Sequence, residues 1–209
     1  MARPDLLKEG DSYTFRSYFE MPYETDEILS AFDVSLVSKK LSLPRTEVPN
    51  ETVESLKTRL EALLGVVELA SETARREIMV SPVLTQVVLW SGSRLRIEYP
   101  LVINEQLKGK LDYLVEGSHR LLVIEAKNDD LSRGFTQLCV ELIALSRRES
   151  TQSLLYGAVT IGNIWLFGWL DASAQTVYRD TSLYSVPNDL QDVMEILMGI
   201  LSADQLATA

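Results

Sequence analysis

Residues 108–145 read KGKLDYLVEGSHRLLVIEAKNDDLSRGFTQLCVELIAL and carry the clearest structural signal in the chain. Their pattern predicts a strand over 109–116, a tight turn, a second strand over 120–127 and a helix over 130–147. Both faces of the second strand carry apolar side chains, which is typical of a central strand covered on two sides. We therefore expect this unit to lie at the centre of a sheet.

Three charged side chains belong to these predicted strands. Asp112 lies within the first strand, and Glu125 and Lys127 end the second as Glu-Ala-Lys. Side chains alternate across a strand, so Glu125 and Lys127 share one face. Each residue alone has an ordinary structural explanation. An acid and a lysine on a buried strand need a specific role, however, because burying unpaired charge is costly.

The turn between the two strands determines which face Asp112 occupies. The Gly-Ser pair at 117–118 predicts a two-residue turn, since glycine supplies the positive φ that such turns need. That turn pairs Glu116 with His119 and makes Asp112 a diagonal neighbour of Glu125, with Cβ atoms roughly 7–8 Å apart. A three-residue turn would place the two carboxylates on opposite faces of the sheet.

These residue types suit a divalent cation. Two carboxylates reaching inward from neighbouring strands can ligate one Mg²⁺ ion, at Mg–O distances of about 2.0–2.1 Å. A lysine on the same face can activate a water molecule beside the ion. Gln137 and Glu141 lie one turn apart on the following helix, where we expect Glu141 to occupy the solvent-facing surface. A solvated helix face is also the expectation for Arg75, Arg76, Arg133, Arg147 and Arg148, although each could contact phosphate.

The composition limits the class of protein. The chain has 209 residues, enough for one domain with a sizeable core, and a net charge of −10 at pH 7, which argues against a surface that coats nucleic acid broadly. No apolar run is long enough to span a membrane. The single cysteine, Cys139, is expected in the core and fits a reducing, cytoplasmic compartment. The single histidine, His119, leaves little material for a zinc site or a Ser-His-Asp triad.

The N-terminal quarter is expected to form a small β-α-β extension, residues 1–50, packed on the core. It contains a predicted strand over 13–19, a short helix over 24–32 and a strand over 35–43. The polar segment that follows, with prolines 44 and 49, predicts a linker.

The remaining elements follow from hydrophobic periodicity. Pro82 is expected to kink a helix or to begin a new one after Ser81. The strand that follows the 130–147 helix should pair parallel to an earlier strand, because a helical crossover reverses the chain. In all, the periodicity predicts further helices over 52–67, 70–88 and 189–201, and further strands over 94–99, 154–160, 164–170 and 176–186.

The order helix, three-stranded meander, helix and strand, together with Asp112 and Glu125-Ala126-Lys127, resembles the PD-(D/E)XK nuclease superfamily over about residues 52–170. The resemblance implies an α/β (α+β), restriction-endonuclease-like fold: a three-layer core with a central mixed β-sheet flanked by helices, here residues 51–209. Leu111 stands where the family name has proline, and many members lack that proline. The chain is most similar to uncharacterised bacterial members in which the core helix carries a glutamate followed by arginines, here SETARRE at 71–77.

By the same resemblance, Glu72 is the acid on the core helix and Gln137 is the helix residue of the later motif. Glu77 is a rival for Glu72, and helical phase leaves both open. Asp112, Glu125 and Glu72 would hold Mg²⁺, with Mn²⁺ as the other candidate.

The expected activity is hydrolysis of phosphodiester bonds in DNA, with Lys127 orienting or deprotonating the attacking water and Gln137 positioning the lysine, the water or a phosphate. A homodimer is possible for such a nuclease. The alternative is a non-catalytic nuclease-fold protein that acts as a binding or interaction subunit. The acidic surface and the lack of a DNA-reading module favour this alternative, whereas the intact acid, acid and lysine set favours the enzyme.

Overall fold

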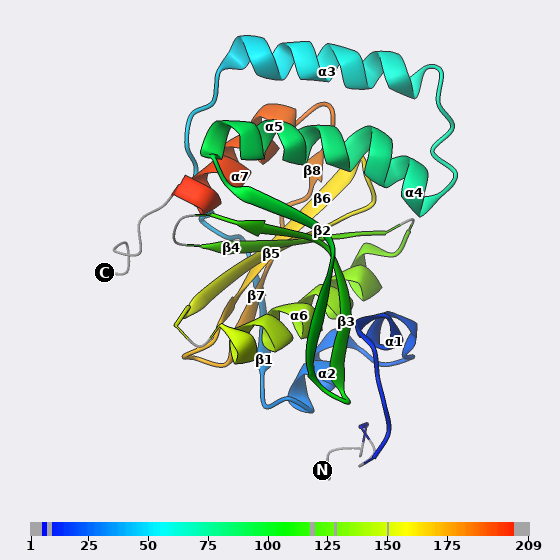
Figure 1. Cartoon of the computed structure of the whole chain (residues 1–209), viewed down its shortest axis with the longest axis vertical. Coiled ribbons are helices and arrows are strands. Elements are labelled where there is room, and N and C mark those ends of the chain that lie inside the picture. The colour runs from blue at the N-terminus through cyan, green and yellow to red at the C-terminus, as the bar shows by residue number, and fades with distance from the viewer. Residues whose placement is uncertain (1–5, 8–9, 118–119, 128, 150, 203–209) are drawn as a thin grey trace.

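The computed structural model describes residues 6–7, 10–117, 120–127, 129–149 and 151–202. Within these residues the chain forms a mixed α/β structure around an open, eight-stranded mixed sheet (Figure 1). The strand order is β1-β7-β6-β5-β4-β3-β2, and β8 pairs with β6. The strands are β1 Ser35–Lys39, β2 Arg94–Asn104, β3 Leu107–Glu116, β4 Leu121–Ala126, β5 Leu154–Thr160, β6 Ile164–Asp171, β7 Thr176–Asp180 and β8 Tyr184–Ser185.

The strand pairings predicted around the central unit are confirmed. β2, β3 and β4 are antiparallel neighbours, and β4 pairs in parallel with β5 after the helical crossover. The segment predicted over 176–186 forms two strands, β7 and β8. β1, from the N-terminal segment, pairs in parallel with β7 and so forms one edge of the same sheet.

Helices cover both faces of the sheet (Figure 1). One face packs against α1 Phe15–Glu20, α2 Thr25–Ser30 and α6 Leu131–Arg148. The other packs against α3 Asn50–Leu64, the π-helix η1 Arg76–Val80, α5 Ser81–Ser91 and α7 Leu190–Ser202, with α4 Glu72–Arg75 leading directly into η1. No helix in the described part of the chain is both long and apolar enough to span a membrane.

Side-chain alternation in β4 explains why the sheet has two cores. Leu122, Ile124 and Ala126 belong to the core beneath α5 and α7, whereas Val123 belongs to the core beneath α6. All four side chains are at most 1% exposed. The prediction of a central strand covered on both sides is therefore confirmed.

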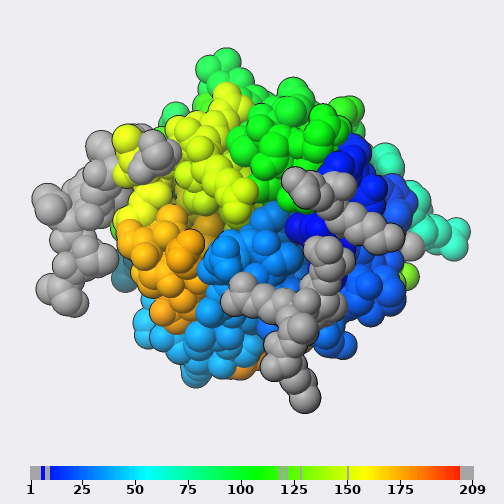
Figure 2. Space-filling view, turned by 90° about the horizontal axis from the view of Figure 1, so that it is seen from below, coloured from blue at the N-terminus to red at the C-terminus, as the bar shows by residue number. Residues whose placement is uncertain are grey.

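The strand predicted over 13–19 is wrong, because this segment forms helix α1. Thr14 and Ser17 make a reciprocal capping box at its start, which satisfies backbone donors that a strand would leave unpaired. Phe15 and Tyr18, one helical turn apart, are then buried together, and the Tyr18 hydroxyl donates to the Gln106 carbonyl oxygen at 2.7 Å. Figure 2 shows the blue N-terminal segment packed against the green β2–β3 hairpin.

The predicted register between β3 and β4 is also wrong, by two residues. Glu116 pairs with Leu121 instead of His119, and the Gly117 amide donates to the Arg120 carbonyl oxygen at 2.9 Å, so the chain reverses between Gly117 and Arg120, one residue later than predicted. Ser118 and His119 themselves lie outside the described residues. A shift of two preserves the face of every side chain, since strands alternate with period two. Continued by one residue, the observed register sets Asp112 directly across from Glu125.

The contact between α1 and the hairpin depends on Gly109. Its φ is +154°, and a Cβ there would lie 2.7 Å from Cδ2 of Phe15. We expect Gly109→Ala to lower the free energy of unfolding by about 1–3 kcal/mol and to loosen α1, because side chains that are forced to overlap must move apart. Hydrogen exchange of the α1 amides checks this.

Gly92→Ala is the matched control, because Gly92 also has a positive φ, +66°, but has no atom within 4 Å of the added Cβ. This variant should retain the exchange protection of α1. Equal loosening of α1 in both variants would show that backbone conformation, and not the approach of Phe15, causes the effect.

Candidate active site

Asp112 lies where the sheet opens. The β3–β4 ladder begins one residue later, at Tyr113 and Ile124, and the β2–β3 ladder is interrupted opposite Asp112, at Glu98, whose φ is +50°. In place of a backbone partner, Oδ2 of Asp112 accepts a hydrogen bond from the Ala126 amide at 2.9 Å. The opening allows side chains from both helical layers to reach the same place.

Glu125 and Lys127 are held at the end of β4. The Lys127 amide donates to the Thr160 carbonyl oxygen at 2.8 Å, which extends the parallel pairing with β5 beyond the strand. Nζ of Lys127 lies 2.6 Å from Oε1 of Glu125, and the two side chains are 10% and 2% exposed. The ammonium group also lies 4.9 Å from the centre of the Phe19 ring on α1.

Helix α6 supplies the third contact. Nε2 of Gln137 donates to Oε1 of Glu125 at 2.7 Å and to Oε1 of Glu141 at 2.9 Å. Glu141 is 0% exposed, so the expectation that it lies on the helix surface is wrong. Because Gln137 joins Glu141 to Glu125 on β4, Glu141 lies on the side of α6 that faces the sheet.

Five predicted site residues surround one cavity of about 350 Å³: Glu72, Asp112, Glu125, Lys127 and Gln137. Of the two candidate acids near α4, Glu72 is half-buried and lines the cavity, whereas Glu77 is exposed and is not part of the lining. The lining is completed by Thr14, Phe15, Arg16, Gly109 and Lys110.

The sequence-based prediction missed the N-terminal contribution to this cavity. Thr14, Phe15 and Arg16 were assigned to a strand of a separate extension. The signal for α1 was present in the capping box, but nothing local indicates that α1 docks beside residues nearly one hundred positions later. Arg76 was also expected in solvent, yet its Nη1 lies 3.3 Å from Oδ1 of Asp112 and its side chain is 16% exposed.

Burial makes the cavity electrostatically unusual. Burial, with a second contribution from the nearby Asp112 carboxylate, raises the pKa of Glu125 to about 8. Burial also raises the pKa of Glu141 well above its ordinary value, with a second contribution from Glu125. Burial lowers the pKa of Lys127, but the attraction and hydrogen bond of Glu125, together with the charges of Asp112 and Glu141, outweigh this effect and leave the lysine pKa raised. The cavity therefore favours a charged lysine and a proton held among the buried carboxyls.

The residues present fit a hard divalent cation. Oε2 of Glu125, Oε1 of Gln137 and Oε2 of Glu141 are buried oxygens without a hydrogen-bond partner, and oxygen is the ligand that Mg²⁺ prefers. In the described residues, no three or more acidic, histidine or cysteine side chains are already grouped as a metal centre. Instead, Arg76 and Lys127 pair with Asp112 and Glu125.

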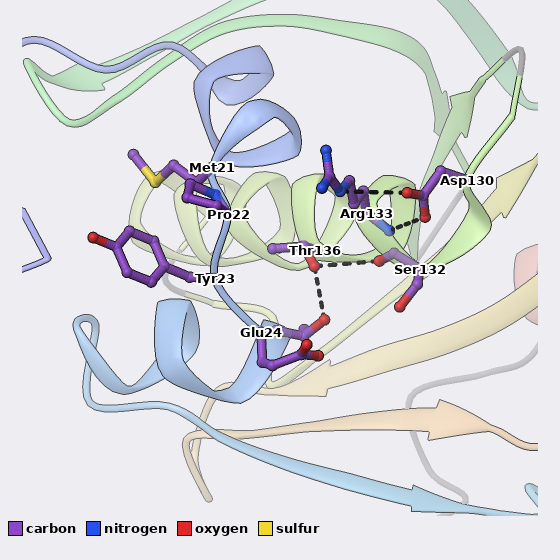
Figure 3. Close-up of a pocket in the computed structure, with 9 residues that line it drawn as sticks. Met21, Pro22, Tyr23, Glu24, Asp130, Ser132, Arg133 and Thr136 are labelled. Carbon is purple, nitrogen blue, oxygen red and sulfur yellow. Dashed lines mark hydrogen bonds and ion pairs between the residues drawn. The ribbon is translucent and has the colours of Figure 1, made fainter.

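A second pocket, of about 310 Å³, lies between the α1–α2 connection and the start of α6 (Figure 3). Several of its polar groups pair with each other: Arg133 pairs with Asp130 at 3.3 Å, and the hydroxyls of Thr25 and Thr136 are 2.7 Å apart. None of the predicted site residues lines it. The cavity around Asp112 and Glu125 is therefore the candidate site.

The stability of the metal-free protein should fall as pH rises. Because the folded state raises the pKa of Glu125 from 4.5 to about 8, it binds that proton more tightly than the unfolded state does. This contribution is fully present below about pH 4.5 and is lost as pH rises toward 8. Denaturant unfolding in chelator at several pH values measures it.

Glu125→Gln should make the stability curve flatter between these pH values, since the variant has no proton to lose. Glu54→Gln, at an exposed acid of α3, is the control for removal of a carboxyl elsewhere. An unchanged slope in Glu125→Gln would mean that the buried carboxyl does not govern the pH dependence.

The cavity also depends on Gly134 of α6. A Cβ at this position would lie 3.0 Å from Cγ of Lys127 and 2.7 Å from Cγ2 of Val159. We expect Gly134→Ala to displace the lysine stem and to cost about 1–3 kcal/mol of stability. The chemical shift of the Lys127 side chain, measured by NMR, should change more than that of Lys39, which lies on the edge strand β1.

Comparison with known proteins adds no assignment: no family model matches the sequence, and no curated protein is significantly similar to it. The inference of function therefore rests on the chemistry of this cavity.

Proposed function

We propose that the protein is a metal-dependent nuclease that hydrolyses phosphodiester bonds in DNA, with a PD-(D/E)XK site in a restriction-endonuclease-like core. One observation carries the proposal: two strand carboxylates, a lysine, a helix acid and a helix glutamine line a single cavity. The antiparallel β2-β3-β4 unit, the parallel β4–β5 pair and helices on both faces support the fold assignment.

Asp112, Glu125 and Glu72 would hold Mg²⁺ or Mn²⁺, since all three line the cavity and offer carboxylate oxygens. A divalent cation bound there supplies charge that polarises a phosphate and makes a nearby water more acidic.

Lys127 would stabilise negative charge as it develops on the reacting phosphate. Its raised pKa keeps the amine protonated, so it is suited to donate hydrogen bonds. Phe19 covers the ammonium group and limits its contact with bulk water, which strengthens its electrostatic effect. Gln137 orients Glu125 through the hydrogen bond between their side chains.

A specific observation favours the second candidate, a non-catalytic interaction subunit. Asp112 is already paired with Arg76, and Glu125 with Lys127, so internal cations partly neutralise both strand acids. The net charge of −10 also opposes broad contact with nucleic acid. Metal binding distinguishes the candidates, because a purely structural charge cluster has no need for a divalent ion.

Two substitutions separate metal binding from chemistry. Asp112→Asn should lose cation binding and cleavage, while still offering an oxygen to the Ala126 amide. Lys127→Met should retain the cation, because lysine is not a ligand, and should slow cleavage by about 10²–10³, the usual cost of removing a group that stabilises developing charge. The measurements are calorimetric titration with Mn²⁺ and cleavage of single-stranded, duplex and branched DNA.

Asp180→Asn is the matched control for Asp112→Asn: it removes a buried carboxyl, 2% exposed, at the end of β7. It should leave cation affinity and cleavage rate unchanged. If Asp112→Asn and Lys127→Met both cleave like the parent, the residues are structural and the interaction-subunit hypothesis replaces the nuclease.

Two exposed basic side chains at the cavity, Arg16 and Lys110, would contact the DNA backbone. Each substitution to alanine should weaken binding equally across sequences and reduce the slope of log affinity against log salt by about 1. Lys39→Ala, on the opposite edge of the sheet, should leave the slope unchanged. Fluorescence anisotropy over a salt series measures it.

A further inference from the structure

Arg76 lies between two carboxylates beside the cavity. Its Nη1 is 3.3 Å from Oδ1 of Asp112 and 3.7 Å from Oε1 of Glu98. The guanidinium also lies 5.2 Å from the centre of the Tyr113 ring. Arg76 begins the π-helix η1, a conformation that is often found at functional sites. The largely buried guanidinium can therefore pair with either of two acids, Asp112 or Glu98.

The pairing leaves no oxygen of Asp112 unengaged. Oδ2 accepts from the Ala126 amide, and Oδ1 faces Arg76. A divalent ion that approaches this carboxylate must share Oδ1 with the guanidinium or displace it. Because two cations that share one carboxylate repel each other, Arg76 opposes cation binding in the protein without substrate.

The structure also provides a route for Arg76 to leave Asp112. Glu98 lies across from Asp112 on β2, is about half exposed, and already reaches both Arg76 and Lys110. A phosphate entering the cavity would offer Arg76 a better acceptor than either acid, since guanidinium and phosphate form paired, charge-assisted hydrogen bonds.

We infer that Arg76 is a substrate-responsive counter-ion: it neutralises Asp112 in the free protein, and a nucleic-acid phosphate draws it away so that the divalent cation binds more tightly. The inference rests on the proposed nuclease function and adds a regulation of its metal site. By linkage, the cation must tighten nucleic-acid binding by the same factor.

The test measures Mn²⁺ affinity by calorimetry, with and without a phosphorothioate oligonucleotide, which keeps backbone charge and resists hydrolysis. In the parent, the oligonucleotide should tighten Mn²⁺ binding by about tenfold, a typical coupling. Arg76→Met should bind Mn²⁺ about tenfold more tightly without the oligonucleotide, and the enhancement should disappear. Arg76→Lys, which keeps the charge, should stay close to the parent.

Arg96→Met is the matched control. Arg96 also pairs with a carboxylate, Glu116 at 2.8 Å, and lies 5.0 Å from a tyrosine ring centre, that of Tyr99, but Glu116, unlike Asp112, does not line the cavity. It should change neither Mn²⁺ affinity nor the coupling. Arg76→Gln, which keeps donors toward Asp112, serves as the second neutral variant if Arg76→Met does not fold.

The outcomes separate this inference from the proposed function. If the parent binds Mn²⁺ but the neutral variants bind it no more tightly, Arg76 is a structural partner of Asp112 and only this inference fails. If the parent binds no Mn²⁺ with or without the oligonucleotide, the nuclease proposal fails and this inference fails with it.

Discussion

An acid and an ammonium group are buried together at the end of β4, and the ammonium group could not remain charged there alone. Glu125 and Lys127 lie 2.6 Å apart, with the acid 2% exposed. Removing Glu125 would leave an uncompensated charge in the core, which typically costs about 3–5 kcal/mol, whereas the acid can take up a proton. Three neighbouring residues accommodate this pair. Gln137 donates a hydrogen bond to Glu125, Gly134 leaves space for the aliphatic part of Lys127, and the Phe19 ring covers the ammonium group.

The same arrangement brings three acids and only two basic side chains together. Asp112, Glu125 and Glu141 share a small region with Arg76, Lys127 and one neutral amide. Protons and internal cations both neutralise the acids, and the proposed divalent ion would compete with them. The raised pKa of Glu125 and the position of Arg76 beside Asp112 have the same cause: negative charges that are crowded together away from water repel each other strongly.

Much of the fold was predictable from local pattern. Strand β4 was recognised because both of its faces are apolar, and the helix after it because its apolar residues recur with helical spacing. The common face of Asp112 and Glu125 was predicted with the wrong register and holds nevertheless, since the error of two residues matches the period of a strand. The prediction for α1 failed because the apolar residues of this segment suggested a strand. The capping box favours a helix instead, and that helix buries Phe15 and Tyr18.

The sequence by itself determined most of the helices and strands, the central position of β4 and the identities of the strand acids and the lysine, because these depend on short-range periodicity and side-chain chemistry. Tertiary structure alone decided that α1 closes the cavity, that Glu72 lines it while Glu77 faces solvent, and that Glu141 and Arg76 are buried beside the acids. These outcomes depend on which distant segments come together, and the residue pattern within one helix or strand does not show which segment will pack over it.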